Sequence, residues 1–227
     1  MKMKTLSMLA GVGAPLIATA TASAGFLGIK VVSKENNFGL LVCNVYAEFD
    51  RPGEDFMQAV AGTADAPLLI QIKGGGTFYN HDFGSDGSPN LALIAAFQSL
   101  AFDTFMTIGA KHFSPTFPDN TVLTPDQPGL VGTQISTTTS GWAVTPIDPQ
   151  GDPFNTDYSS GNGQILIAQY STIAGPGVTI TGTFLVQYVS NGKNGQSIVS
   201  FVHVPTPGAL ALLGAAGLIG TRRRRRA

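Results

Sequence analysis

The 227-residue sequence has one cysteine, one tryptophan and few charged residues, which make up 12% of the chain. A disulfide needs two cysteines, so Cys43 has no partner within the chain, and we expect it in the interior as a small apolar residue. One cysteine also argues against a structural zinc cluster. The apolar runs of the chain are short, and Gly, Thr, Ser, Asn and Pro separate them.

Motifs of common catalytic sites are missing as well. The chain contains no H-E-x-x-H, no G-x-S-x-G and no phosphate-binding loop. The three histidines, His81, His112 and His203, are scattered along the sequence. We expect them to be solvated side chains rather than a catalytic base or metal ligands. We therefore expect no enzymatic activity and no cofactor.

Acidic residues dominate the middle of the chain. Seven of the thirteen basic residues lie close to the two ends, so residues 25–203 keep six basic against fourteen acidic residues, a formal net charge of −8. Such a surface repels phosphate groups, and we expect no nucleic-acid partner. Asp50, Glu54 and Asp55 surround Pro52 and Gly53, a pattern that predicts a charged, exposed loop.

Two acidic loops carry the oxygen ligands that calcium prefers. The first contains Asp82, Asp86 and Asn90, and the second contains Asp148, Asp152, Asn155 and Asp157. Neither loop matches the EF-hand pattern, and ordinary Asx turns explain both equally well. We predict no metal site, with Asp82, Asp86, Asp148 and Asp152 as weak calcium candidates.

Period-two alternation of apolar and polar residues predicts β-strands. The expected strands are Phe26–Val32, Cys43–Phe49, Leu68–Lys73, Leu100–Ile108, Ile165–Tyr170, Val178–Val189 and Ser197–Val204. The apolar run Asn90–Ser99 also fits a short helix. Turn residues separate these segments, and the length suits one domain. The sequence therefore predicts an all-β fold, a single β-sandwich or jelly-roll-like domain over residues 25–203.

The first 24 residues have the pattern of a signal peptide. Lys2 and Lys4 precede an apolar stretch, and Ala22 and Ala24 fit the A-x-A cleavage rule. Gly25 is then the first residue of the mature protein. The alternative, an N-terminal membrane helix, fits less well because glycines and a proline interrupt the apolar run.

The C-terminal segment, residues 204–227, has three parts. A proline motif comes first, Val204, Pro205, Thr206 and Pro207, whose prolines keep the backbone extended. An apolar stretch follows, which at about 13 residues is shorter than the roughly 20 needed to span a bilayer untilted. Five arginines end it, Arg222, Arg223, Arg224, Arg225 and Arg226. The positive-inside rule places them in the cytoplasm and the body on the outer side of the membrane.

This segment resembles the PEP-CTERM sorting domain of Gram-negative bacteria, a tail also labelled ice-binding protein C-terminal domain, which is no indication of ice binding. The resemblance covers Val204–Ala227, and Thr206 stands where the family most often has Glu. It implies transient insertion into the inner membrane and processing near the motif by exosortase, a membrane-embedded cysteine transpeptidase-like enzyme. The alternative is a simple C-terminal membrane anchor.

Three functional hypotheses follow. The leading one is a non-enzymatic exported protein of the cell surface or extracellular matrix, with exosortase and the secretion machinery as partners. The second is a surface carbohydrate-binding module for extracellular polysaccharide, in which Trp142, Tyr79 or Tyr158 would stack on sugars. The third is a secreted hydrolase with two carboxylates in a cleft. A row of threonines, Thr179, Thr181 and Thr183, reads as an ordinary exposed strand face.

Overall fold

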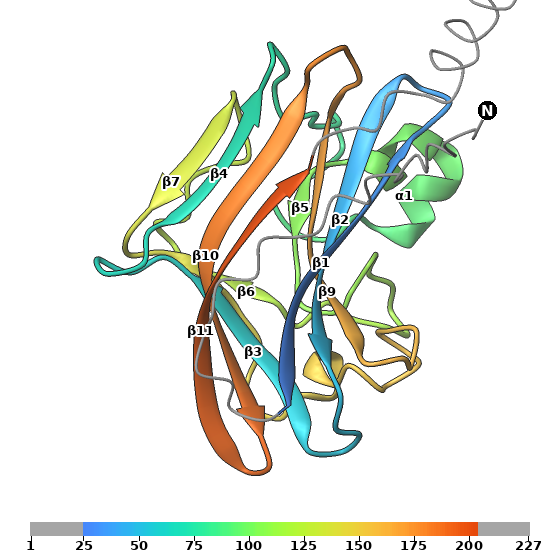
Figure 1. Ribbon diagram of the computed structural model, residues 1–227. Helices are drawn as coiled ribbons and strands as arrows, with labels where there is room; N and C mark the ends of the chain where they lie inside the picture. Colours follow the sequence, from blue (N-terminus) through green and yellow to red (C-terminus); the bar gives the residue numbers. More distant parts are fainter. Residues whose placement is uncertain (1–24, 204–227) are drawn as a thin grey trace, which may run out of the picture.

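A computed structural model of the chain describes residues 25–203 (Figure 1). The predicted cleavage positions Ala22 and Ala24, the Val204–Pro207 motif and the Arg222–Arg226 run lie outside the described residues. Within the described part, no helix has both the length and the apolar character to cross a bilayer.

Two antiparallel sheets pack against each other as a β-sandwich, which confirms the predicted fold class. The first sheet has the order β1-β2-β9-β5. Its strands are β1 (Phe26–Glu35), β2 (Leu40–Phe49), β5 (Phe105–Met106) and β9 (Gln164–Ile173). Every pairing in this sheet is antiparallel.

The second sheet has the order β6-β8-β3-β10-β4-β7, with β11 also paired to β10. Its strands are β3 (Asp55–Ala61), β4 (Leu68–Lys73), β6 (Val122–Leu123), β7 (Gln134–Thr137), β8 (Gly141–Ala143), β10 (Thr179–Ser190) and β11 (Lys193–His203). Strand β10 pairs with β11 along almost its whole length, and on its other edge with β3 and β4 in succession.

The alternation predicted for β2 is confirmed. Cys43, Val45 and Ala47 are fully buried, whereas Asn44 and Tyr46 on the other face are half-buried. Burial raises the pKa of the Cys43 thiol to about 12, so this cysteine stays protonated and unreactive in the folded protein.

Strict alternation was the wrong expectation for β9. Val45 pairs with Ala168 and Tyr46 with Leu166, so Ile167 is an extra residue in a β-bulge. The bulge shifts the facing pattern, and Ile167 joins the core together with Ala168 and Tyr170. Period-two alternation over Ile165–Tyr170 would place Ile167 and Ala168 on opposite faces, and the bulge makes this expectation wrong.

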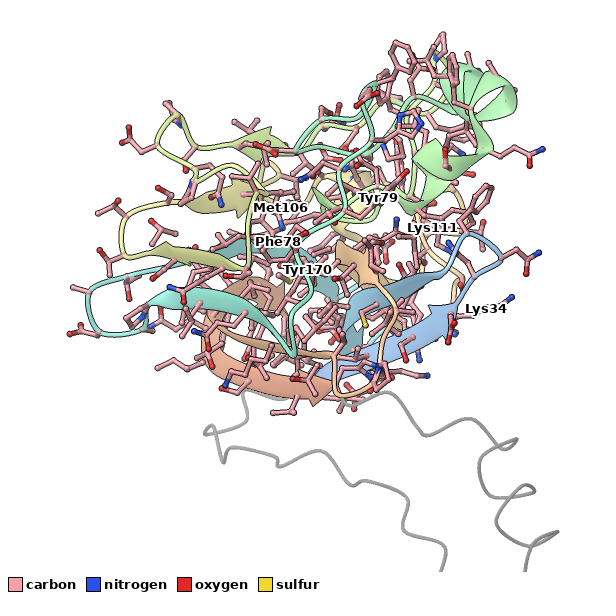
Figure 2. The ribbon with its side chains drawn as sticks, turned by 90° about the horizontal axis from the view of Figure 1, so that it is seen from above. Lys34, Phe78, Tyr79, Met106, Lys111 and Tyr170 are labelled. Carbon is pink, nitrogen blue, oxygen red and sulfur yellow. The ribbon has the colours of Figure 1, made fainter. Side chains whose placement is uncertain are left out.

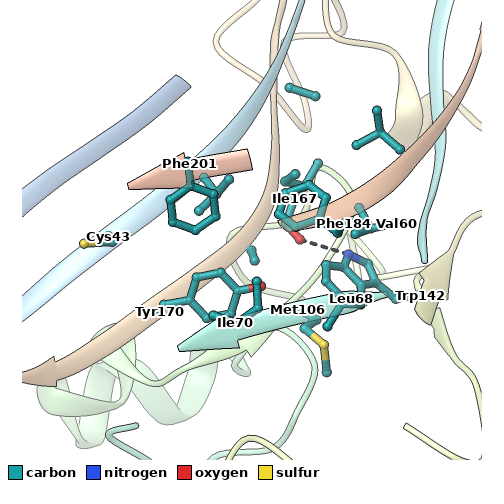
Figure 3. Close-up of a cluster of buried hydrophobic side chains, with 14 of the residues drawn as sticks. Cys43, Val60, Leu68, Ile70, Met106, Trp142, Ile167, Tyr170, Phe184 and Phe201 are labelled. Atoms are coloured by element: carbon teal, nitrogen blue, oxygen red, sulfur yellow. Dashed lines mark hydrogen bonds between the residues drawn. The ribbon is translucent and has the colours of Figure 1, made fainter. Parts of the chain in front are cut away.

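The core between the sheets is rich in aromatic and branched side chains (Figure 3). Trp142 of β8 belongs to this core, and its Nε1 donates to the carbonyls of Ile167 at 2.9 Å and Thr107 at 3.1 Å. Both hydrogen bonds are buried. Trp142 is therefore a core residue, and it is not available to stack on sugars as the carbohydrate-binding alternative would require.

The strand predicted over Leu100–Ile108 is also wrong for most of its length. Helix α1 (Leu91–Ala96) and the 3₁₀ helix η1 (Gln98–Phe102) come first, and only Phe105–Met106 is a strand. Asn90 caps α1, since its Oδ1 accepts from the Ala92 N–H at 2.9 Å. A second 3₁₀ helix, η2, covers Pro149–Gly151.

Candidate functional site

Two clefts share Lys111 and His112 in their lining: one lies between the α1–η1 segment and the first sheet, and the other lies among the loops of residues 109–117 and 156–159. Their volumes are about 230 and 240 Å³, respectively. Figure 2 shows Lys111 between α1 and the blue strands of the first sheet. We call them the loop cleft, which includes Phe117 and Tyr158, and the sheet cleft, which includes Asn44 and Tyr46.

The backbone after β5 positions Lys111 and His112. Gly109 donates its N–H to Leu166 O at 2.7 Å, so the chain continues beside β9. Gly109 has a φ of +86°, and a Cβ there would meet Gln150 O at 2.3 Å. Glycine is therefore required where the chain leaves the sheet. Phe113 then forms a bridge with Asn90, and Lys111 and His112 span the interval between sheet edge and helix.

Gln150 fixes the loops behind the loop cleft. Its fully buried side chain donates to Ile108 O at 2.6 Å and Asp119 Oδ1 at 2.7 Å, and accepts from Asn120 N at 2.7 Å. It also donates to Thr121 Oγ1 at 3.0 Å. A single amide thus joins the backbone just before the loop cleft to residues 119–121 and holds these two segments together.

The floor of the sheet cleft comes from β2 and β9. Gln169 donates to Ala101 O at 3.0 Å and Asp103 O at 2.8 Å, which holds the covering segment on the sheet. The Oδ1 of Asn44 is buried, and within residues 25–203 it has no hydrogen-bond partner. A ligand hydroxyl or amine would satisfy it. Burial raises the pKa of Tyr46, so its phenol is neutral and able to donate.

The loop cleft combines aromatic and charged side chains. The rings of Phe117 and Tyr158 lie 6.5 Å apart in an edge-to-face arrangement. Burial, then the charges of Asp148 and nearby aspartates, raise the pKa of Tyr158. Among residues 25–203, Asp157 is the one carboxylate that lines the two clefts. A cation, neutral phenols, an amide and aromatic surface can together bind a sugar.

Of the candidate calcium ligands, Asp148 and Asp152 accept backbone hydrogen bonds within local turns. Asp148 caps η2 by accepting from Gln150 N at 2.8 Å, and Asp152 accepts from Phe154 N at 2.8 Å. Asp86 accepts from Leu130 N at 3.3 Å, and Asp82 is exposed. In the part of the chain that the structure describes, no group of three or more His, Cys, Asp or Glu side chains could hold a metal.

The three histidines lie apart. His112 lines both clefts. His81 accepts from Phe83 N at 3.1 Å through Nδ1. Burial lowers the pKa of His203 at the end of β11. Of the other predicted site residues, Tyr158 lines the loop cleft, while Tyr79 is half-buried beside β9.

The acidic loop prediction is wrong for Asp55. This residue begins β3 and is 0% exposed, whereas the side chains of Asp50 and Glu54 remain about half exposed. The threonine row does lie on one half-exposed face of β10. Neighbouring strands place Gln71 and Val202 opposite Thr181, so the row does not extend across the sheet.

Sequence reasoning missed Lys111, Asn44 and Phe117, because neither charge nor polarity alone distinguishes a cleft residue from a surface residue.

No family model matches the chain, and comparisons with curated proteins and with solved structures found no match.

Proposed function

We propose that this chain is a non-enzymatic exported protein of the cell surface or extracellular matrix, processed by exosortase through its C-terminal segment. The supporting observation is the arrangement of the two sequence signals around the domain. Strand β1 begins at Phe26, two residues after Ala24, and β11 ends at His203, directly before the Val204–Pro207 motif. The domain is thus complete between the two proposed cleavage positions.

Intact mass spectrometry on protein from the native cell envelope and medium tests this proposal. A mass that begins at Gly25 and ends near Pro205–Pro207 is the expected result, with or without an added group. A mass that still includes Arg226 would contradict processing and favour a retained anchor. The double variant Pro205→Ala/Pro207→Ala should block processing. The matched control, Pro128→Ala in the body, should be processed like the parent protein.

A second candidate function, binding of extracellular polysaccharide, is favoured by the shared position of Lys111 and His112 in two clefts with Tyr46 and Tyr158. Each cleft is smaller than the roughly 300 Å³ at which pockets for drug-sized ligands begin, so each suits a single sugar unit. Two adjoining subsites match successive units of a chain. Lys111 favours acidic sugars, because its ammonium pairs with a carboxylate or sulfate.

A glycan array with the purified protein tests the second candidate. We expect binding to acidic polysaccharides that Lys111→Gln weakens about tenfold. Lys193→Gln, at the β10–β11 hairpin, is the matched control and should leave binding unchanged. No binding to any glycan, or an equal loss in both variants, would remove this candidate.

A further inference from the structure

Gly25 and Asp55 meet at one corner of the sandwich. Gly25 directly precedes β1, and Asp55 begins β3, where it pairs with Ser190 at the end of β10. The Gly25 carbonyl accepts from Asp50 N at 3.2 Å. Three segments that are distant in sequence therefore converge on this corner.

The Asp55 carboxylate is buried with one oxygen unused. Oδ2 accepts from the Arg51 N–H at 2.8 Å. Among residues 25–203, Oδ1 has no hydrogen-bond partner, although the residue is 0% exposed. A buried carboxylate without a compensating donor is costly, so an oxygen in this position points to a missing cationic or donor group.

The neighbouring cation does not supply that group. The guanidinium of Arg51 lies 3.9 Å from Asp50 Oδ1 and 3.9 Å from Glu54 Oε2. Its side chain is directed to these two exposed carboxylates, and its ion pairs within the described residues do not include Asp55. The corner thus holds three carboxylates against one guanidinium.

Gly25 brings its main chain against the unused oxygen. A Cβ on Gly25 would lie 2.4 Å from Asp55 Oδ1, and the φ of +135° also requires glycine. Standard bond lengths then place the Gly25 nitrogen within about 5 Å of this oxygen. As a peptide N–H, this nitrogen has a single fixed donor direction, whereas an ammonium has three that rotate.

We infer that Asp55 binds the α-ammonium group of Gly25 after removal of the signal peptide, in a buried ion pair that forms only in the mature protein. The inference rests on the proposed export. Signal peptidase hydrolyses the Ala24–Gly25 bond with one water. Ala24 keeps the carboxylate, and the Gly25 amine takes up a proton below its usual pKa of about 8. The new charge lies within the range at which opposite charges stabilise each other.

Removal of the signal peptide therefore also completes the fold. In the precursor, the Gly25 nitrogen is an uncharged amide, and Asp55 Oδ1 stays without a counterion. In the mature chain, the ion pair joins the start of β1 to the first residue of β3 and so ties the two sheets together at this corner. The precursor domain is accordingly less stable than the mature one.

Thermal unfolding of defined N-terminal forms tests the inference. Chains through Ala227 are prepared in mild detergent, beginning at Gly25 or at Ser23, each with Asp55 or Asp55→Asn. The Ser23 start moves the ammonium up to about 7 Å away. We expect the Gly25 form to melt about 3–6 °C above the Ser23 form, and Asp55→Asn to abolish this difference. Asp50→Asn, an exposed carboxylate at the same corner, should preserve it.

Acylation of the α-amine at neutral pH provides a second readout that does not depend on folding stability. We expect the amine of the Gly25 form to react at least tenfold more slowly than that of the Ser23 form, and Asp55→Asn to accelerate it. Equal melting temperatures together with equal acylation rates of the two forms would overturn the ion pair. A native protein that does not begin at Gly25 would instead overturn the export proposal, whatever these forms show.

Discussion

Trp142 donates its indole N–H to the carbonyl of Ile167 across 2.9 Å, and so connects the two sheets by a hydrogen bond (Figure 3). Trp142 belongs to β8 of the second sheet, and Ile167 is the bulge residue of β9 in the first. The Ile167 carbonyl also accepts from the Thr107 N–H at 3.2 Å, and the indole is its second donor. A polar contact thus fixes how the sheets are placed on each other, in addition to their apolar packing.

Replacement of Trp142 by Phe should therefore destabilise the fold by about 2–4 kcal/mol, because it leaves a cavity and removes the indole N–H that two buried carbonyls share. Urea unfolding followed by circular dichroism measures the change. Val131→Ala, at a position 68% exposed, is the control and should stay within about 0.5 kcal/mol of the parent. Similar effects of the two substitutions would contradict the bridging role.

Cys43 should react with thiol reagents only when the protein unfolds. Its side chain is buried, and burial raises the pKa of its thiol to about 12, so the thiolate is scarce and inaccessible in the native state. Labelling across a urea gradient should follow the loss of circular dichroism. Rapid labelling of the folded protein would show that the interior around β2 opens locally.

Gln150→Leu should cost about 2–4 kcal/mol, because the apolar side chain keeps the volume but leaves the Asn120 N–H and Ile108 O without partners. Urea unfolding measures the loss, and hydrogen exchange at Asn120 should accelerate. Gln134→Leu is the matched control, since Gln134 is exposed and bonds to the half-buried Gln71 at the sheet surface. A neutral Gln150→Leu would mean that the loops behind the cleft are held by other contacts.

Asp103 should make stability fall as the pH rises. Burial raises its pKa from 3.8 to about 6, against hydrogen bonds from backbone N–H groups, including that of His81. The folded state keeps this proton to a higher pH than the unfolded chain. The raised pKa of Asp103 contributes up to about 3 kcal/mol to the free energy of unfolding. This contribution is fully present below about pH 4 and is lost as the pH rises past 6. Asp103→Asn should flatten this dependence in urea unfolding at pH 4–7, and Asp65→Asn should not.

The fold class was predictable because the long strands carry local signals. Alternation identified β2, and β4 was predicted with its observed bounds, Leu68–Lys73. Asn191–Gly192, with positive φ at both residues, forms the tight turn between β10 and β11 that this dipeptide favours. Short strands such as β6, with two residues, are too brief for a periodic pattern.

The errors have a common physical origin in tertiary contacts. Leu100–Ile108 alternates like a strand, but Gln169 of β9 binds the carbonyls of Ala101 and Asp103 and holds this segment across the sheet. Helix α1 is apolar yet has no buried residue, against the usual association of apolar character with burial. The clefts could not be predicted, because Lys111 and Tyr46 meet only through the packing of three separate segments.

Strand β10 also has a kinetic consequence. It pairs with β3, β4 and β11, and β11 is the last element of the domain to be synthesised. Nucleation of the second sheet must therefore bring together residues separated by more than a hundred positions, which slows folding. A chain that stops before Lys193 would display the open edge of a 12-residue strand, and such nascent or truncated chains are the ones that we expect to aggregate.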